Sequence, residues 1–463
     1  MVAQHSGGSR NQAGEAEGPL GGYVFVKQVM SRLLWGTSIP VGAQVFATRI
    51  AGYAFGVVTA VLVARMLGPR DRGIWSVALL VAGLLALVAE TGIGTSTLYL
   101  MRKSPERRDA VITASVSVVL ALSLGWVVVM FALVRGGGVP LLEGVPTGVL
   151  AVAIVSTIPM SATMVTRYNL LSFEDTDGAN QSTLFQAVSL TSLLAPVLLL
   201  RGGAGPAIWA YLLSAVATLV FTGGRLLWRH RVQFRWDIAL LRPLLSYGVK
   251  SHVGSIALFL TYRVDILIVN YYLGLSAAGV YSVAIALSEI LRGIPETAQI
   301  VVLSRSGRNL RSESESVCRI ALAATVVFGV LLAISSHWLV PLVFGSSYEG
   351  ASGAFWLLFP GVLGLAVSYS LSPRLALSGD VGVSVRAALV ALVVMVVIDI
   401  RAVPAWGLPG AAFASSVAYW VLAGLQLRRL SVMGELRLRN LVPRSEDFLS
   451  RIRRAARCLS FRP

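Results

Sequence analysis

The sequence predicts an all-α integral membrane protein with twelve transmembrane helices in two six-helix bundles, related by a pseudo-two-fold axis along the membrane normal. Three observations lead to this prediction: an apolar composition, twelve long apolar segments and an internal repeat. Hydrophobic residues make up 56% of the 463 residues and charged residues only 13%, and the mean hydropathy is +0.75. Soluble domains carry about 25% charged residues. This chain therefore has too few charges to cover a water-exposed surface.

Twelve segments are long and apolar enough to cross a bilayer, whose hydrocarbon core requires about 20 apolar residues per helix. Several of them, such as 110–134, contain no charged residue. So many long apolar segments disfavour the alternative of buried helices in a large soluble protein. The predicted spans are 38–66, 74–101, 110–134, 148–168, 180–200, 206–227, 244–274, 277–304, 317–341, 352–373, 382–400 and 406–427.

The distribution of Lys and Arg predicts the orientation, because cytoplasmic loops retain positive charge. Of the 39 Lys and Arg residues, 30 fall in tails and loops on the side of the two termini and 5 in loops on the other side. We therefore expect a multi-pass protein of the cytoplasmic (inner or plasma) membrane with both termini in the cytoplasm. The net charge of +17 then faces anionic lipids at the cytoplasmic surface and lends no support to nucleic-acid binding.

The predicted domain organisation follows from these spans. The tails are polar or basic, and the longest cytoplasmic loop separates two sets of six spans. We expect a disordered N-tail with an interfacial helix at its end (1–37), an N-terminal six-helix bundle (38–228), a cytoplasmic linker (229–243), a C-terminal six-helix bundle (244–428) and a basic cytoplasmic C-tail (429–463).

An internal repeat relates the two halves. Residues 67–91 align with 273–297 at an offset of 206 without a gap, and nine of the 25 positions are identical. An even number of spans in each half gives both halves the same orientation, with a central cavity between them. The first span of each half should turn into the second at a conserved glycine of the repeat, which tolerates a tight turn. The identities include Gly68/Gly274, Gly73/Gly279, Ser76/Ser282 and Glu90/Glu296.

Three stretches resemble one family of transporters. They are ARMLGPRDRGIWSVALLVAGLLALVAETGIGTSTL, YRVDILIVNYYLGLSAAGVYSVAIAL and LVFGSSYEGASGAFWLLFPGVLGLAVSYSLSPRLALSGD. They are similar to the first hairpin, the seventh and eighth helices and the ninth-to-tenth helix region of the polysaccharide-transport flippases. These lipid-linked oligosaccharide and O-antigen type proteins belong to the multidrug/oligosaccharidyl-lipid/polysaccharide exporter superfamily. The likeness covers roughly 38–428. The family often has Asp where this chain has Glu90, which keeps the charge but changes its reach.

Charges within the predicted spans are the candidate site residues. A charge at mid-bilayer costs about 2.5–3.5 kcal/mol on insertion scales, so one that persists usually faces a polar cavity or a partner. A guanidinium can bind phosphate through two parallel hydrogen bonds. The candidate substrate-binding residues are Arg49, Arg263 and Arg292, and the candidate ion-coupling residues are Glu90, Asp265, Glu289 and Glu296.

The spacing of some of these charges leaves two interpretations open. Glu289, Arg292 and Glu296 share one helix face, where they either neutralise one another or combine an ion site with a substrate contact. Arg263 and Asp265 are two residues apart and point to nearly opposite sides, so they are not expected to face one cavity centre.

The resemblance implies a flippase that translocates polyprenyl-pyrophosphate-linked oligosaccharide across the cytoplasmic membrane by alternating access, for biosynthesis of cell-surface polysaccharide such as lipopolysaccharide. The chain has no Walker A sequence, which favours a secondary transporter over an ATPase or an enzyme. We expect no resident cofactor or metal, with proton or Na⁺ coupling. The expected partners are the lipid-linked saccharide, anionic lipids at the cytoplasmic face and polysaccharide assembly enzymes.

Two other functions stay open at this point. A multidrug/cation antiporter of the same superfamily would need a net acidic cavity, and the charges inside the spans do not separate it from a flippase. A membrane saccharide polymerase or ligase would use a sizeable outer loop with acid and base residues, and the predicted outer loops are short.

Overall fold

The computed structural model describes residues 41–136, 138–304, 310–377 and 380–434. The predicted N-tail with its interfacial helix, and nearly all of the predicted C-tail, lie outside these residues. Chain packing separates Met1–Ala47 from a second unit, Thr48–Pro463, which contains the packed helices. Within the described residues the structure is helical and has no strand, so the predicted all-α class is confirmed.

Eleven α-helices and four short 3₁₀ helices follow one another along the described chain. The α-helices are α2 (Val41–Glu90), α3 (Ile93–Lys103), α4 (Arg108–Arg135), α5 (Thr147–Ser172), α6 (Thr176–Leu199), α7 (Ala204–His230), α8 (Leu241–Ser304), α9 (Leu310–Phe344), α10 (Gly350–Leu377), α11 (Val381–Trp406) and α12 (Leu408–Val432). The 3₁₀ helices are η1 (Pro105–Arg107), η2 (Pro140–Leu142), η3 (Ile238–Leu240) and η4 (Ser346–Tyr348).

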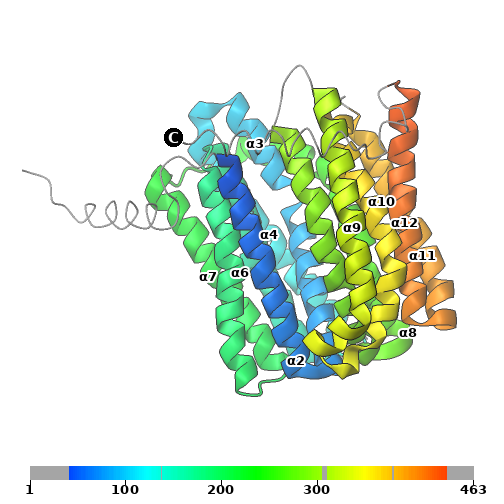
Figure 1. Cartoon of the computed structure of the whole chain (residues 1–463). Coiled ribbons are helices and arrows are strands. Elements are labelled where there is room, and N and C mark those ends of the chain that lie inside the picture. The colour runs from blue at the N-terminus through cyan, green and yellow to red at the C-terminus, as the bar shows by residue number, and fades with distance from the viewer. Residues whose placement is uncertain (1–40, 137, 305–309, 378–379, 435–463) are drawn as a thin grey trace, which may run out of the picture. The chain divides into compact units, whose positions relative to one another are not determined.

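The two longest helices each bend at a glycine of the repeat. Gly68 in α2 has φ 73° and ψ 174°, and Gly274 in α8 has φ 81° and ψ 175°. Glycine alone adopts this region of backbone space readily. Each long helix is thus two helical arms joined by a sharp turn, and α2 reverses direction at the lower end of Figure 1. We call this end of the molecule the bend end, and the opposite end the linker end.

By length and composition, the described residues contain ten helices able to cross a membrane. Two of them, Ala47–Lys103 and His252–Gln299, each contain one of the bends. Divided there, the helices correspond to the twelve predicted spans, and the number of crossings and the two-bundle division stay predictions. One boundary was wrong: the predicted span 74–101 is broken at Thr91 and Gly92, which have φ 50° and 71°.

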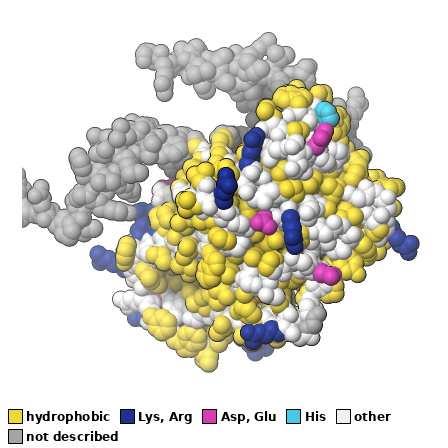
Figure 2. All heavy atoms as spheres, turned by 90° about the horizontal axis from the view of Figure 1, so that it is seen from below, with side chains coloured by type: hydrophobic (Ala, Val, Ile, Leu, Met, Phe, Trp, Pro, Cys, Tyr) yellow, Lys and Arg dark blue, Asp and Glu magenta, His cyan; other side chains and the backbone are white. Residues whose placement is uncertain are grey.

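The helices pack mainly within each half of the sequence. In the first half α5 lies against α4 and α7, and α6 against α7; in the second, α10 and α11 both contact α8 and α12. The helix α3 contacts both α5 and α8 and so joins the halves at the linker end. Seen from the bend end, a few scattered charged side chains interrupt a surface that is mainly apolar or uncharged (Figure 2).

Candidate functional site

Two cavities lie beside the arms of α2 and α8. The bend-side cavity, of about 360 Å³, reaches from Gly56 past Arg72 to Arg263 and Glu289. The linker-side cavity, of about 510 Å³, lies between the first arm of α2, the helix α6 and Glu296. Both are lined by Gly56, Thr59 and Leu190. The duplicated arms therefore border two cavities that share three lining residues and contain charged side chains of both halves.

In the linker-side cavity the two halves are joined by an ion pair. Nη1 of Arg49, on the first arm of α2, lies 3.3 Å from Oε1 of Glu296, on the second arm of α8. The Tyr53 hydroxyl donates a hydrogen bond of 2.9 Å to Oε2 of the same carboxylate. The side chains of Arg49 and Glu296 are 37% and 30% exposed, so water or a ligand can reach both groups.

The bend-side cavity contains a second charged group shared by both arms of α8. Arg263 on the first arm donates a hydrogen bond to Glu289 on the second. Arg292 lies 3.7 Å from the same carboxylate oxygen, and its guanidinium lies over the Tyr262 ring at 5.1 Å from the centroid. The Glu289 carboxylate thus contacts two arginines. The predicted cluster of Glu289, Arg292 and Glu296 on α8 is divided, because Glu296 turns to α2.

Asp265 lies apart from both cavities, in the interior between α8 and α12. It is 1% exposed and accepts hydrogen bonds from the Tyr281 hydroxyl (2.8 Å), the Ser415 hydroxyl (3.0 Å) and the Ile266 amide (2.9 Å). Arg263, two residues away, lines the bend-side cavity. The two charges therefore face different surroundings, as their spacing predicts.

Sequence reasoning missed a second buried carboxyl, Asp399 on α11. Its side chain is fully buried, and neither carboxyl oxygen has a hydrogen-bond partner among the described residues. It interacts electrostatically with Asp265. The predicted span 382–400 placed Asp399 at a helix end, whereas α11 continues to Trp406 and encloses it.

Arg72 is a second missed residue, because the sequence placed it in an outer loop. It is 4% exposed and lines the bend-side cavity. Its guanidinium donates hydrogen bonds to the Ala60 carbonyl (2.6 Å) and the Ser282 hydroxyl (2.7 Å), and lies between the rings of Phe344 and Tyr348. Ser282 is one of the identical positions of the internal repeat. This identity was the sequence signal that could have indicated a contact at this turn.

Glu90, a candidate ion-coupling residue, lines neither of the two cavities. It is 4% exposed and accepts hydrogen bonds from the amides of Gly92 (3.0 Å) and Gly94 (2.6 Å). Nδ1 of His252, on α8, lies 3.4 Å from the carboxylate, and Nε2 of the ring is 2.6 Å from the Leu87 carbonyl. Glu90 therefore holds the break between α2 and α3 against α8. Its repeat partner Glu296 has no such break beside it and stays available for Arg49.

Relatives identified by sequence are polysaccharide transport proteins. The succinoglycan biosynthesis transport protein ExoT of Rhizobium meliloti is 26% identical over 291 residues, which cover 62% of this chain and 56% of that protein. The probable low-salt glycan biosynthesis flippase Agl15 of Haloferax volcanii is 24% identical over 200 residues, which cover 41% and 42%. The chain spans about half the length of the curated relatives it matches.

Solved structures with the same fold are transporters. The lipid II flippase MurJ in an inward closed conformation is similar with a TM-score of 0.71 at 14% identity, over 86% of this chain and 89% of that one. An inward-facing multidrug resistance transporter of the MATE family of the MOP superfamily has a TM-score of 0.64 at 16% identity, over 89% and 98%. At such identities the likeness shows the fold alone.

The family itself is shown by a sequence profile. The profile described as "Polysaccharide biosynthesis protein" matches residues 62–353, which include both bends, every candidate charge except Arg49, most of the bend-side cavity and half of the residues that line the linker-side cavity. This match extends over more than half of the chain and agrees with the predicted resemblance. The chain belongs to the polysaccharide biosynthesis protein family.

Proposed function

We propose that the protein is a flippase that moves polyprenyl-pyrophosphate-linked oligosaccharide across the cytoplasmic membrane for synthesis of cell-surface polysaccharide. The observation that carries this proposal is the set of arginine–carboxylate pairs lining the cavities between α2 and α8. An anionic sugar headgroup needs such a path, because each hydroxyl moved into hydrocarbon without a partner costs several kcal/mol. The names of ExoT and Agl15 support the choice of a glycan substrate.

The ion pairs give each cavity arginine an anionic partner when no substrate is bound, so the carrier is stable with and without its substrate. In the empty protein Glu296 neutralises Arg49, and Glu289 neutralises Arg263. A pyrophosphate can replace the carboxylate as the partner of the guanidinium, since Arg binds phosphate and carboxylate with the same fork of donors. The released carboxylate then faces the cavity water. Substrate binding in this scheme exchanges one partner for another and leaves no arginine unpaired in the apolar slab.

Alternating access requires contacts that close each end in turn. At the bend end the two glycine turns pack backbone to backbone, and Arg72 ties the arms of α2 to Ser282. At the linker end Glu90 and His252 join α2 to α8. In the proposed orientation the linker end and both termini are cytoplasmic. The sparse charge at the bend end supports this (Figure 2), as does the basic character of the linker-end loops.

We further propose that the buried carboxyls Asp265 and Asp399 bind the coupling ion, either a proton or Na⁺. Asp399 has no hydrogen-bond partner among the described residues, and Asp265 has three donors around it. Asp265 lies on α8 and Asp399 on α11, helices that contact each other and α12, so a change in the charge of these carboxyls acts on the second half of the molecule. The coupling role of Glu90 is not part of this proposal, because its contacts are those of a helix junction.

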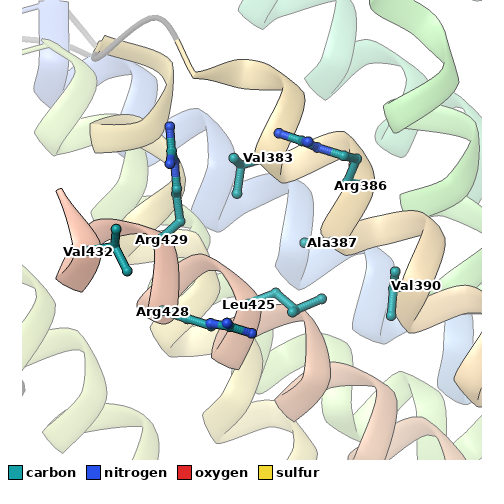
Figure 3. A pocket seen from close by; sticks show the side chains of 8 residues that line it. All are labelled: Val383, Arg386, Ala387, Val390, Leu425, Arg428, Arg429 and Val432. Atoms are coloured by element: carbon teal, nitrogen blue, oxygen red, sulfur yellow. The ribbon is translucent and has the colours of Figure 1, made fainter.

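Anionic lipid headgroups are proposed partners at the linker end. A groove of about 320 Å³ between α11 and α12 is lined by the arginines Arg386, Arg428 and Arg429 together with aliphatic side chains that include Val390 and Leu425 (Figure 3). Of these arginines Arg429 is paired, with Asp380 at 2.6 Å. The other two guanidiniums are exposed and suit lipid phosphates at the predicted cytoplasmic surface.

The cavity charges favour the flippase over a cation antiporter. Glu289 and Glu296, the acids that line the cavities, each have an arginine partner, so neither cavity is net acidic. The loop between α4 and α5, the longest predicted outer loop, holds one 3₁₀ turn and no described pair of acidic side chains. A transporter without catalysis is therefore the proposal.

The proposal is tested in proteoliposomes with a fluorescent lipid-linked oligosaccharide, whose transfer is read by quenching from outside. The native protein is expected to raise the transfer rate above that of empty vesicles. Arg49→Ala should lower it about tenfold or more, since a charge-assisted contact contributes about 1.5–3 kcal/mol. Absence of transfer by the native protein, together with export of a cationic dye, would overturn the flippase in favour of the antiporter.

A further inference from the structure

We propose that one face of α6 forms a saccharide subsite that recognises sugar hydroxyls through side-chain amides and a hydroxyl. The inference rests on the proposed flippase function and adds to it where the sugar part of the headgroup binds. The face consists of Asn180, Thr183 and Gln186, which line the linker-side cavity opposite Arg49. Below we call these three residues the amide face.

The side-chain amide of Gln186 is oriented by a half-buried arginine. Nη2 of Arg167, on α5, donates a hydrogen bond of 2.8 Å to Oε1 of Gln186, and Arg167 is held in place by Ser182 at 2.9 Å. Because the amide oxygen faces Arg167, the amide nitrogen points elsewhere. Gln186 is half-buried on the cavity wall, and its nitrogen donates no hydrogen bond to a described residue. Arg167 thus occupies the amide oxygen and leaves both N–H donors of Gln186 available on a residue that lines the cavity.

Asn180 and Thr183 extend this wall toward the linker end. Asn180 is half-buried, and its amide forms no hydrogen bond with another described residue. The Thr183 hydroxyl donates to the Ala179 carbonyl at 3.1 Å, which leaves its oxygen free to accept. Toward the bend end the wall closes where Thr59 of α2 and Thr191 of α6 form a hydroxyl pair at 2.8 Å. The amide face therefore offers both donors and acceptors, as a sugar ring with several hydroxyls requires.

The opposite wall supplies the complementary chemistry. Arg49, Tyr53 and Glu296 form the charged side of the same cavity. Between the walls, a Cβ atom added at Gly52 or Gly56 would meet no heavy atom within 4 Å, so the floor is open. A volume of about 510 Å³ lies in the range of small-ligand sites. A headgroup can place its pyrophosphate on the charged wall and its first sugars on the amide face.

A purely structural role does not explain the amide face. The polar side chains that bind α6 to α7 have partners of their own: Ser182 pairs with Thr222 at 2.6 Å and Ser189 with Ser214 at 2.9 Å. Those residues satisfy one another across the α6–α7 contact. Asn180 and the Gln186 nitrogen have no such partner in the described chain. Polar groups left unpaired at membrane depth usually face a water-filled or ligand-filled space.

The inference is tested with two substrates in the vesicle assay: a polyprenyl pyrophosphate carrying an oligosaccharide and one carrying a single sugar. Asn180→Ala and Gln186→Leu should each slow transfer of the oligosaccharide about three- to tenfold, as expected for one lost hydrogen bond. Transfer of the single-sugar lipid should change less. Ser189→Ala is the matched control, since it removes a polar group from the packing face of the same helix. Native-like transfer of both substrates by both variants would overturn the subsite.

A second measurement keeps the test independent of variant stability. With Cys318 and Cys458 replaced by serine, Thr183→Cys should react with a hydrophilic maleimide, and oligosaccharide-pyrophosphate lipid should slow that reaction at least threefold. Polyprenyl pyrophosphate without sugar should protect much less. Equal protection by both lipids, or none by either while the native protein transfers substrate, would refute the amide face. Failure of the native protein to transfer any substrate would instead refute the proposed function.

Discussion

Gly73 and Gly279 lie back to back, each pressed against the backbone of the other's turn. A Cβ atom on Gly73 would lie 1.9 Å from the Leu275 carbonyl oxygen, and one on Gly279 would lie 1.8 Å from the Pro69 carbonyl oxygen. The two positions are equivalent in the internal repeat. The duplication thus builds a symmetric closure at the bend end, where only residues without a side chain allow the two turns to meet.

Gly73→Ala should open this closure. The added methyl group overlaps backbone atoms that cannot rotate away, so the turns must separate, and the protein should favour states open at the bend end. Paired spin labels on the two turns should report a longer distance in the variant. Gly125→Ala is the control, because a Cβ at Gly125 meets no atom within 4 Å; a distance unchanged from native in Gly73→Ala would show that the contact does not close the bend end.

Asp399→Asn should uncouple transfer from an ion gradient. An amide cannot exchange a proton or carry the charge that attracts Na⁺, so transfer by this variant should lose its response to an imposed pH or Na⁺ gradient. The two gradients are imposed separately on the vesicles, and the one that drives native transfer identifies the ion. Asp380→Asn changes an acid outside the buried pair and should keep the native response. A native response in Asp399→Asn would remove Asp399 from the coupling site.

The pair of Arg49 and Glu296 should behave as a unit. Glu296→Gln removes the partner of Arg49, so the empty protein should bind inorganic pyrophosphate more tightly, while Arg49→Ala should bind it at least tenfold more weakly, in line with the strength of charge-assisted hydrogen bonds. Calorimetry on purified protein measures both affinities. Arg49→Lys keeps the positive charge but loses the forked pair of donors. Its affinity for pyrophosphate should therefore lie between those of Glu296→Gln and Arg49→Ala. Equal affinities in all three variants would exclude Arg49 as a phosphate contact.

Asp175 should stabilise the linker end in a pH-dependent way. Burial alone would raise the pKa of its carboxyl, but hydrogen bonds from Arg225, His230 and the Gly178 amide hold the pKa well below its usual range. A carboxyl with a lowered pKa in the folded state contributes stability above its unfolded pKa and loses it as the pH falls toward the folded value. Asp175→Asn should therefore lower the melting temperature at pH 7 by several degrees and less at pH 3.

The control for this prediction is Asp177→Asn, an exposed acid two residues away in the first turn of the same helix. It should change the melting temperature little at either pH. The geometry behind the difference is the buried pair of Asp175 with Arg225, joined at 2.7 Å and 2.8 Å. If Asp175→Asn and Asp177→Asn had the same effect at pH 7, the ion pair would contribute nothing to stability.

Several features of the fold could be predicted because each depends on a short stretch of chain. An apolar run of about 20 residues predicts a membrane helix wherever it packs, and a repeated glycine predicts a turn, which Gly68 and Gly274 confirm. The divergence of Arg263 and Asp265 follows from their spacing on one helix. The break at Thr91 was missed, since it depends on Glu90 capping the amides that follow and on its contact with His252 of another helix.

The sequence alone predicted the membrane class, the spans, the charge asymmetry and the set of intramembrane charges. Only the tertiary structure decided which charges meet: Arg49 pairs with Glu296, 247 residues away, Arg263 pairs with Glu289, and Asp399 is buried without a hydrogen-bond partner among the described residues. The physical reason is that apolar burial is a property of each segment by itself, whereas an ion pair or a buried carboxyl is defined by partners that distant helices bring within a few ångströms.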